Sequence, residues 1–364
     1  MMNKKKFLFS MVISFCMFLM AVMNFQTNIS AATSGQYALK VGGENTDNVN
    51  IDNGSYMITG DPGQTVEVKL LIINKSSDAR KFEYNVNTAY TTNDGGLGYD
   101  KRKVTDSALK IQTGNLADPN HAVIKIPGTT TATVTAKITI PKKKYTGYLM
   151  GGFNVRPYKE KAKGTVASNG TLIKNKFSYS VPIQIHQKSS ENAEPKYSIT
   201  SVKPGIQNLG QKKHGAVYAN IHNASNSYSG QLDSKAVVTK KGDKSFKITE
   251  TKNGQNIAPT SNYNYMISWG NKNLQSGNYH LKLTYKTSGG LKSWILEKDF
   301  SITNNDAAKY NKLAGIKPNY LWLWILLGVL ALAIILGLGI YLGKRNNNNN
   351  NNGNSGNTTR RRRR

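Results

Sequence analysis

Apolar and polar side chains alternate along much of the middle of this chain. Val66, Val68, Leu70 and Ile72 are separated mainly by polar residues, which is the pattern of a half-buried strand. The same period of two recurs in five further segments: 82–86, 134–140, 177–185, 263–269 and 279–285. Before the last hydrophobic run, only 306–314 suggests a short helix.

Turn-forming residues separate these segments. Glycine, proline and aspartate cluster at 61–63, 94–96, 127–128, 276–277 and 288–290. Many short strands divided by such turns favour sandwiches of the immunoglobulin type. We therefore predict an all-β fold with two immunoglobulin-like β-sandwich domains, followed by a single transmembrane helix.

The first apolar run lies near the N-terminus. Lys4, Lys5 and Lys6 precede an uncharged run over 7–23, and the small residues 30–32 follow it. This order predicts a signal peptide over 1–32 that is cleaved after Ala32 or nearby, with an uncleaved anchor helix as the alternative.

Cysteine use agrees with export to a bacterial exterior. Cys16, the only cysteine, lies inside the first apolar run, behind the bulky Phe15 where a lipoprotein site requires a small residue. Cleavage leaves a mature chain without cysteine, whose core must hold without disulfides.

The second apolar run, 321–342, predicts a membrane span. Its 22 residues at ~1.5 Å each reach about 33 Å, enough to cross the hydrocarbon core. Cationic residues follow at 344–345 and 360–364, so we expect this end in the cytoplasm and residues 33–319 outside the cell, within the cell wall. The Asn-rich segment 343–364 is predicted to be a disordered basic tail.

Composition breaks suggest where the domains end. The polar stretch 187–195 indicates a linker, and a weaker break lies at 159–170. We expect one domain over 36–158 and another over 165–305, with the alternative that strand 177–186 packs on the first domain.

The positive charge is concentrated in the second half of the exported region. The whole chain has a net charge of +29, and residues 159–319 hold 24 cationic and 9 acidic side chains, against 15 and 11 in 37–158. Such a field attracts anionic wall polymers or sulfated host glycans, although scattered lysines also serve solubility alone. The exterior location argues against nucleic acid as a partner.

The familiar catalytic motifs are missing. No nucleophile elbow, phosphate-binding loop or His-Glu-x-x-His motif occurs, and His214 and His222 on one strand would lie about 26 Å apart. Asp94 and Asp100 flank a Gly-rich loop that suggests either a cation site or ordinary turn chemistry. We predict no enzymatic activity, no metal and no cofactor.

Several ordered segments resemble a known family. The first set comprises 60–64, Ala89-Tyr90-Thr91-Thr92-Asn93-Asp94-Gly95-Gly96-Leu97-Gly98-Tyr99 and Tyr145-Thr146-Gly147-Tyr148 through Gly152. It resembles the peptidoglycan-binding domain of the WxL-interacting proteins of Gram-positive bacteria. The second set is similar to the family's host-binding domain; it comprises Lys174–Tyr179, 258–263, 274–279, Trp294, 300–302 and 309–313.

The sequence departs from the family pattern in three places. These are Thr46, the tripeptide at 56–58, and Thr260. The resemblance implies three kinds of partner: peptidoglycan, WxL-domain surface proteins and host extracellular matrix. It therefore indicates a non-catalytic scaffold that attaches WxL-domain proteins to peptidoglycan. The alternatives are a host-directed adhesin acting through the basic second domain and, ranked last, a wall-acting enzyme.

Candidate ligand-binding residues fall into two groups. Aromatic rings stack on sugars, so Tyr90, Asn93, Tyr99 and Tyr148 are expected to line a glycan surface, with strand-edge or core packing as the alternative. Lys240, Lys241 and Lys244 form the densest charge cluster of the second module, and a solvated hairpin tip would explain them equally well.

Overall fold

The computed structural model describes residues 36–160, 164–166, 172–174, 177–210, 212–316 and 321–350. The predicted signal peptide and residues 351–364 of the predicted tail lie outside these ranges. The strands, in chain order, are β1 (Tyr37–Gly42), β2 (Val49–Asn50), β3 (Tyr56–Gly60), β4 (Thr65–Asn74), β5 (Arg80–Thr88), β6 (Tyr90–Thr91), β7 (Leu97–Gly98), β8 (Ala117–Asp118), β9 (His121–Ile126), β10 (Thr131–Thr139), β11 (Leu149–Pro157), β12 (Gly164–Val166), β13 (Leu172–Lys174), β14 (Tyr179–Gln187), β15 (Tyr197–Leu209), β16 (Lys212–Asn223), β17 (Ser229–Lys240), β18 (Asp243–Ile257), β19 (Ser261–Ser268), β20 (Gly277–Thr287) and β21 (Ser293–Ile302). The helices are a 3-10 turn η1 (Thr113–Leu116), α2 (Asn304–Leu313) and α3 (Leu321–Asn350).

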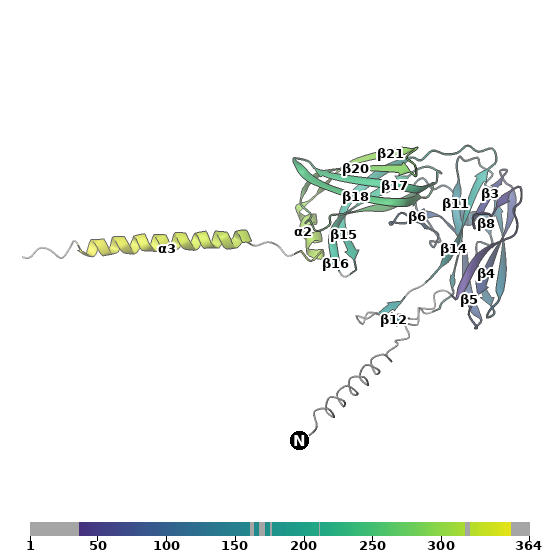
Figure 1. Ribbon diagram of the computed structural model, residues 1–364, viewed down its shortest axis with the longest axis horizontal. Helices are drawn as coiled ribbons and strands as arrows, with labels where there is room; N and C mark the ends of the chain where they lie inside the picture. Colours follow the sequence, from purple (N-terminus) through teal and green to yellow (C-terminus); the bar gives the residue numbers. More distant parts are fainter. Residues whose placement is uncertain are drawn as a thin grey trace, which may run out of the picture. The chain divides into compact units, whose positions relative to one another are not determined.

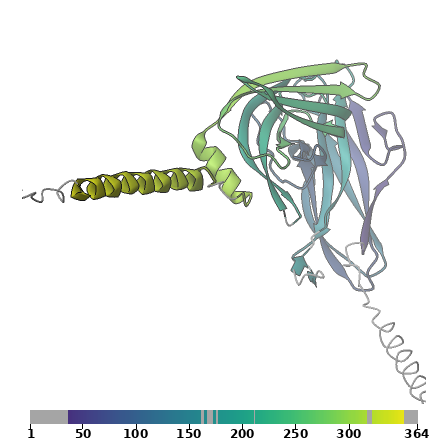
Figure 2. The ribbon, with the colours of Figure 1, turned by 60° about the vertical axis from the view of Figure 1, so that its left-hand side comes forward.

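The first sandwich consists of two sheets. One has the strand order β1-β4-β10-β8, and the other β2-β3-β14-β11-β5-β9. Neighbouring strands are antiparallel except β14 and β3, which run parallel with Ile183 opposite Tyr56. Figures 1 and 2 show that strands, not helices, form the body of the chain between β1 and β21.

Strand β14 belongs to this first sandwich, although it follows the composition break at 159–170. It pairs with β11 from Tyr179 to Ile185 and with β3 from Ile183 to Gln187. Its apolar residues Val181, Ile183 and Ile185 all point into the core. The structural boundary between the sandwiches therefore falls after β14.

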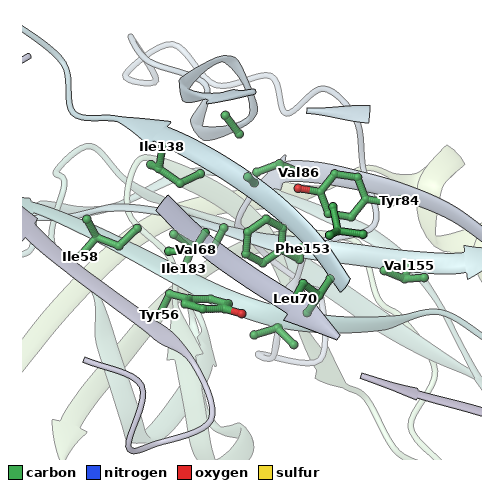
Figure 3. Packing of buried hydrophobic residues seen from close by; sticks show 14 of the residues in the cluster. Tyr56, Ile58, Val68, Leu70, Tyr84, Val86, Ile138, Phe153, Val155 and Ile183 are labelled. Carbon is green, nitrogen blue, oxygen red and sulfur yellow. The ribbon is translucent and has the colours of Figure 1, made fainter. Parts of the chain in front are cut away.

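Alternating side chains of both sheets fill the first core (Figure 3). Phe153 of β11 is fully buried, and its ring lies 5.3 Å from that of Tyr56 and 5.6 Å from that of Tyr84. The row predicted from its alternation, Val66 to Ile72, supplies the opposite face of this core. Burial of this apolar area is the main stabilising contribution in a chain without disulfides.

The second sandwich has sheets of order β15-β16-β19 and β18-β17-β20-β21. Its core is rich in tyrosine, and buried tyrosine hydroxyls there form hydrogen bonds. The hydroxyls of Tyr263 and Tyr285 lie 2.5 Å apart, and the hydroxyl of Tyr265 lies 3.1 Å from Ser234 Oγ. Both sandwiches confirm the predicted all-β, immunoglobulin-like fold.

The chain divides into two compact units. The first holds described residues of Met1–Lys203 together with Val217–Ser268 and Gly277–Ser301, and so includes most of both sandwiches. The second gathers Pro204–Ala216, Trp269–Ser276 and the chain from Ile302 onward.

The last helix, α3, contains one stretch, Leu321–Lys344, that is long and apolar enough to cross a membrane. The helix continues to Asn350, beyond the predicted end of the span at Leu342. The predicted disorder of the tail is therefore wrong for residues 343–350, none of which is a proline, the residue that most strongly interrupts a helix.

Candidate binding surfaces

Within the first compact unit, the β6–β7 hairpin of one sandwich contacts β18 and β19 of the other. The Ala258 N–H donates to Thr91 Oγ1 at 2.9 Å, and Thr91 Oγ1 lies 2.8 Å from Ser261 Oγ. The Asn256 N–H also donates to the Gly95 carbonyl at 2.7 Å. We call this junction the seam.

A small apolar cluster fills the seam. Ala89, Tyr99 and Met150 from the first sandwich pack with Ala258 from the second, and all four are buried. Gly95 has φ +86°, and a Cβ there would overlap the side chain of Gln255. A close approach and a left-handed backbone both require glycine at this point of the hairpin.

Asp106 adds a buried carboxylate to the seam. Its carboxylate accepts hydrogen bonds from Ala108 N at 2.8 Å and from Asn262 Nδ2 at 2.7 Å, and its Oδ1 lies 2.9 Å from His222 Nε2. The side chain is only 2 % exposed. A buried carboxylate is tolerated because these groups replace its water shell, and through them Asp106 links the two sandwiches.

The structure brings Tyr90, Asn93, Tyr99 and Tyr148 together, but at the seam. Tyr99 is 8 % exposed, so its ring has no free face for a sugar. The Asn93 side chain accepts from Asn264 N at 2.8 Å, and the Tyr148 N–H donates to the Asn226 carbonyl at 2.8 Å. Packing across the seam accounts for these positions, and their role in binding glycan stays a prediction.

Tyr90 is partly exposed, unlike the buried Tyr99. Its hydroxyl donates to Asp100 at 2.6 Å, and the Lys101 ammonium lies 3.8 Å from the ring centroid. Burial, and then the hydrogen bond to Asp100, raise the pKa of Tyr90 well above its usual value. Because Lys101 covers one face of the Tyr90 ring and Asp100 binds its hydroxyl, only part of the ring is available to a ligand.

The carboxylates suggested as a cation site take part in the hairpin. Asp94 accepts from the Thr92 hydroxyl and, at 3.4 Å, from the Gly96 N–H. The Thr92 hydrogen bond is the main cause of the lowered pKa of Asp94. Across the ranges given above, no group of three His, Cys, Asp or Glu side chains could hold a metal ion.

The candidate lysines lie at the β17–β18 hairpin, where Lys241 forms an ion pair. Lys241 Nζ lies 2.5 Å from Asp299 of β21, and His280 Nδ1 lies 2.7 Å from the same carboxylate. The Lys241 hydrogen bond, and then that of His280, lower the pKa of Asp299. Lys240 lies 5.9 Å from the Tyr279 ring centroid, and Lys244 is exposed.

Acidic residues of β21 thus offset the lysines that face them. The next pair along the sheet, Lys282 and Glu297, is separated by 3.3 Å. The predicted charge cluster is weaker than its sequence suggested, because Asp299 is 58 positions away from Lys241 in the chain.

Sequence reasoning did not identify four seam residues: Thr91, Asp106, His222 and Ser261. Three of them lie on separate strands and Asp106 lies in a loop, so residue type alone gives no signal that they meet. The one available signal is that segments 89–99 and 258–263, which carry the family resemblance, both supply the seam.

Two models of one protein family match the chain. A family model described as WxL Interacting Protein, peptidoglycan binding domain, matches residues 44–157, and the model of the host binding domain of the same family matches residues 168–312. The second match begins before β14, which the structure assigns to the first sandwich. No curated protein matches the chain.

Solved structures give only a distant likeness. The Pseudomonas aeruginosa CupB2 chaperone is 9 % identical with a TM-score of 0.26, and the match covers 67 % of this chain and 96 % of that one. The E. coli chaperone DraB is 13 % identical with a TM-score of 0.25, over 73 % and 98 %. TM-scores this low support no inference about function. The two family matches together span well over half of the chain, which therefore belongs to the WxL-interacting protein family.

Proposed function

We propose that this protein is a non-catalytic cell-surface scaffold that holds WxL-domain proteins against peptidoglycan. The observation that carries the proposal is the succession of a peptidoglycan-binding domain, a host-binding domain and a membrane-length helix in one chain. In this proposal residues 33–319 lie outside the cell, α3 crosses the membrane once, and the basic end lies in the cytoplasm.

The seam supports a scaffold rather than two independent modules. The buried Asp106 and the apolar cluster around Tyr99 join the two domains within one compact unit. Contacts of this kind would keep the two domains, and ligands bound to them, close together, which suits a protein that presents a partner on the wall.

Retention on both partners tests this function. We expect the full-length chain in nanodiscs to sediment with purified peptidoglycan sacculi and to capture a purified WxL domain, including while bound to sacculi. Empty nanodiscs are the control. A chain that is retained by neither partner would refute the scaffold, and release of labelled fragments from peptidoglycan would show an enzyme instead.

Host contact is the second candidate function, because the host-binding domain model matches residues 168–312. If its basic hairpin contacts anionic host glycans, Asp299→Asn should strengthen binding, since it removes the carboxylate that pairs with Lys241 and His280. We expect the variant to elute from immobilised heparin at higher salt than the wild type.

Asp233→Asn is the matched control for this test. Asp233 is exposed on β17 of the same sheet, so its loss changes the net charge equally. Equal shifts for both variants would show that only net charge matters and would exclude the hairpin as the contact.

A further inference from the structure

The second compact unit carries two exposed tips that combine leucine with lysine. At the turn between β15 and β16, Leu209 is 53 % exposed and is followed by the exposed Lys212 and Lys213. At the end of α2, Leu313 is 46 % exposed and follows the exposed Lys309 and Lys312.

The charge of these tips is not offset. None of the four lysines forms an ion pair within the described part of the chain, in contrast to Lys241 and Lys282. Outside α3, the only acidic residue in this unit's described ranges is Asp306. Asp306 is engaged at the start of α2, where it accepts from Thr303 Oγ1 at 2.7 Å.

Hydrogen bonds connect the segments that carry the two tips within this unit. The Asn311 side chain of α2 accepts from Leu274 N and donates to the Leu274 carbonyl, both at 2.9 Å. The loop that contains Leu274 is in turn fixed to β16, because the Trp269 N–H donates to the Gly215 carbonyl at 2.9 Å. Both tips are therefore carried by one compact unit.

The membrane span begins close by in the chain. Only the residues between Leu313 and Leu321 separate α2 from α3. Eight steps of at most ~3.6 Å limit the end of α2 to about 29 Å from the first residue of the span. The basic unit is consequently tethered within reach of the membrane surface.

We propose that this unit docks on the membrane itself, on the leaflet at the N-terminal end of α3. Lys212, Lys213, Lys309 and Lys312 bind the phosphates of anionic lipid headgroups, while Leu209 and Leu313 enter the boundary between headgroups and acyl chains. Basic residues beside exposed apolar side chains are the combination that interfacial binding requires. The inference rests on the proposed anchoring by α3, and the following experiment tests the two separately.

The experiment uses the full-length chain with Cys16→Ser and one environment-sensitive fluorophore on L209C or L313C. Nanodiscs are made from phosphatidylcholine with or without phosphatidylglycerol, and both carry nitroxide-labelled lipids as quenchers. We expect phosphatidylglycerol to increase quenching at both positions by about twofold or more, and high salt to remove the increase. A label on L332C, inside the span, should be quenched in both lipids.

Two controls separate docking from its alternatives. A label on L291C, at a residue that is 92 % exposed in the first unit, should stay unquenched. The charge-reversed variant K212E/K213E/K309E/K312E should lose the effect at 209 and 313 while L332C stays quenched.

The outcomes decide between the proposals. Loss of quenching at L332C would refute the anchor. Quenching at L332C without an effect of phosphatidylglycerol at 209 and 313, or equal quenching at 291, would overturn the docking surface. A change of fluorescence caused by soluble polyphosphate but not by phosphatidylglycerol would assign the lysines to a wall polymer and would also overturn it.

Discussion

Replacing Phe153 by alanine is expected to lower the free energy of unfolding of the first sandwich by about 3–5 kcal/mol. The ring is fully buried in the middle of β11 and lies against Tyr56 and Tyr84 (Figure 3). Alanine would leave a cavity between two sheets that no disulfide holds together. Urea unfolding, followed by circular dichroism, measures the change.

Phe177→Ala is the matched control. This phenylalanine is 37 % exposed just before β14, so its loss removes less buried area and should cost well under half as much. Equal destabilisation by both variants would contradict the packing of the first sandwich described above.

The cores were predictable because burial follows a period of two. Alternation alone predicts that Val66, Val68, Leu70 and Ile72 share the buried face of a strand, and all four are buried. The pattern works because successive side chains of a strand point to opposite faces of the sheet. Local patterning also identified the membrane-length helix, whose signal is contained in one continuous run.

Pairing partners were not predictable in the same way. The alternation over 177–185 predicts a strand but does not say which sheet receives it, and two assignments stayed open at that point. The parallel pairing of β14 with β3 joins residues more than 120 positions apart. Such a contact depends on tertiary packing, which a short sequence window does not contain.

The surroundings of the candidate site residues were not predictable for a related reason. The residue type of Tyr99 or Asn93 does not reveal whether a second domain covers its exposed face, and here one does. Likewise, the sequence run at Lys240–Lys244 shows its cations but not Asp299, which tertiary structure brings to Lys241. Aromatic and charged side chains suit ligands and domain interfaces alike, so composition cannot separate the two.

The seam gives the family resemblance a physical meaning. Segment 89–99 comes from the peptidoglycan-binding match and segment 258–263 from the host-binding match, and hydrogen bonds at Thr91 join them. Most residues of these segments are small or polar, which suits a close junction of two backbones. In the scaffold proposal, this junction couples the two binding domains.

Ala258→Trp is expected to open the seam. Ala258 is fully buried among Ala89, Tyr99 and Met150, and its N–H is held by Thr91, so a bulky ring cannot fit without separating the segments. Overpacking of this kind costs about 1–3 kcal/mol, and it acts on the coupling between domains rather than on either core. Calorimetry of the full-length chain should show the two sandwiches unfolding further apart in temperature than in the wild type, with faster proteolysis between them. Thr251→Trp, which introduces the same side chain at an exposed position of β18, should change neither result. If Ala258→Trp left the transitions as close together as in the wild type, the seam would not couple the domains, and the scaffold would have to act through two independent modules.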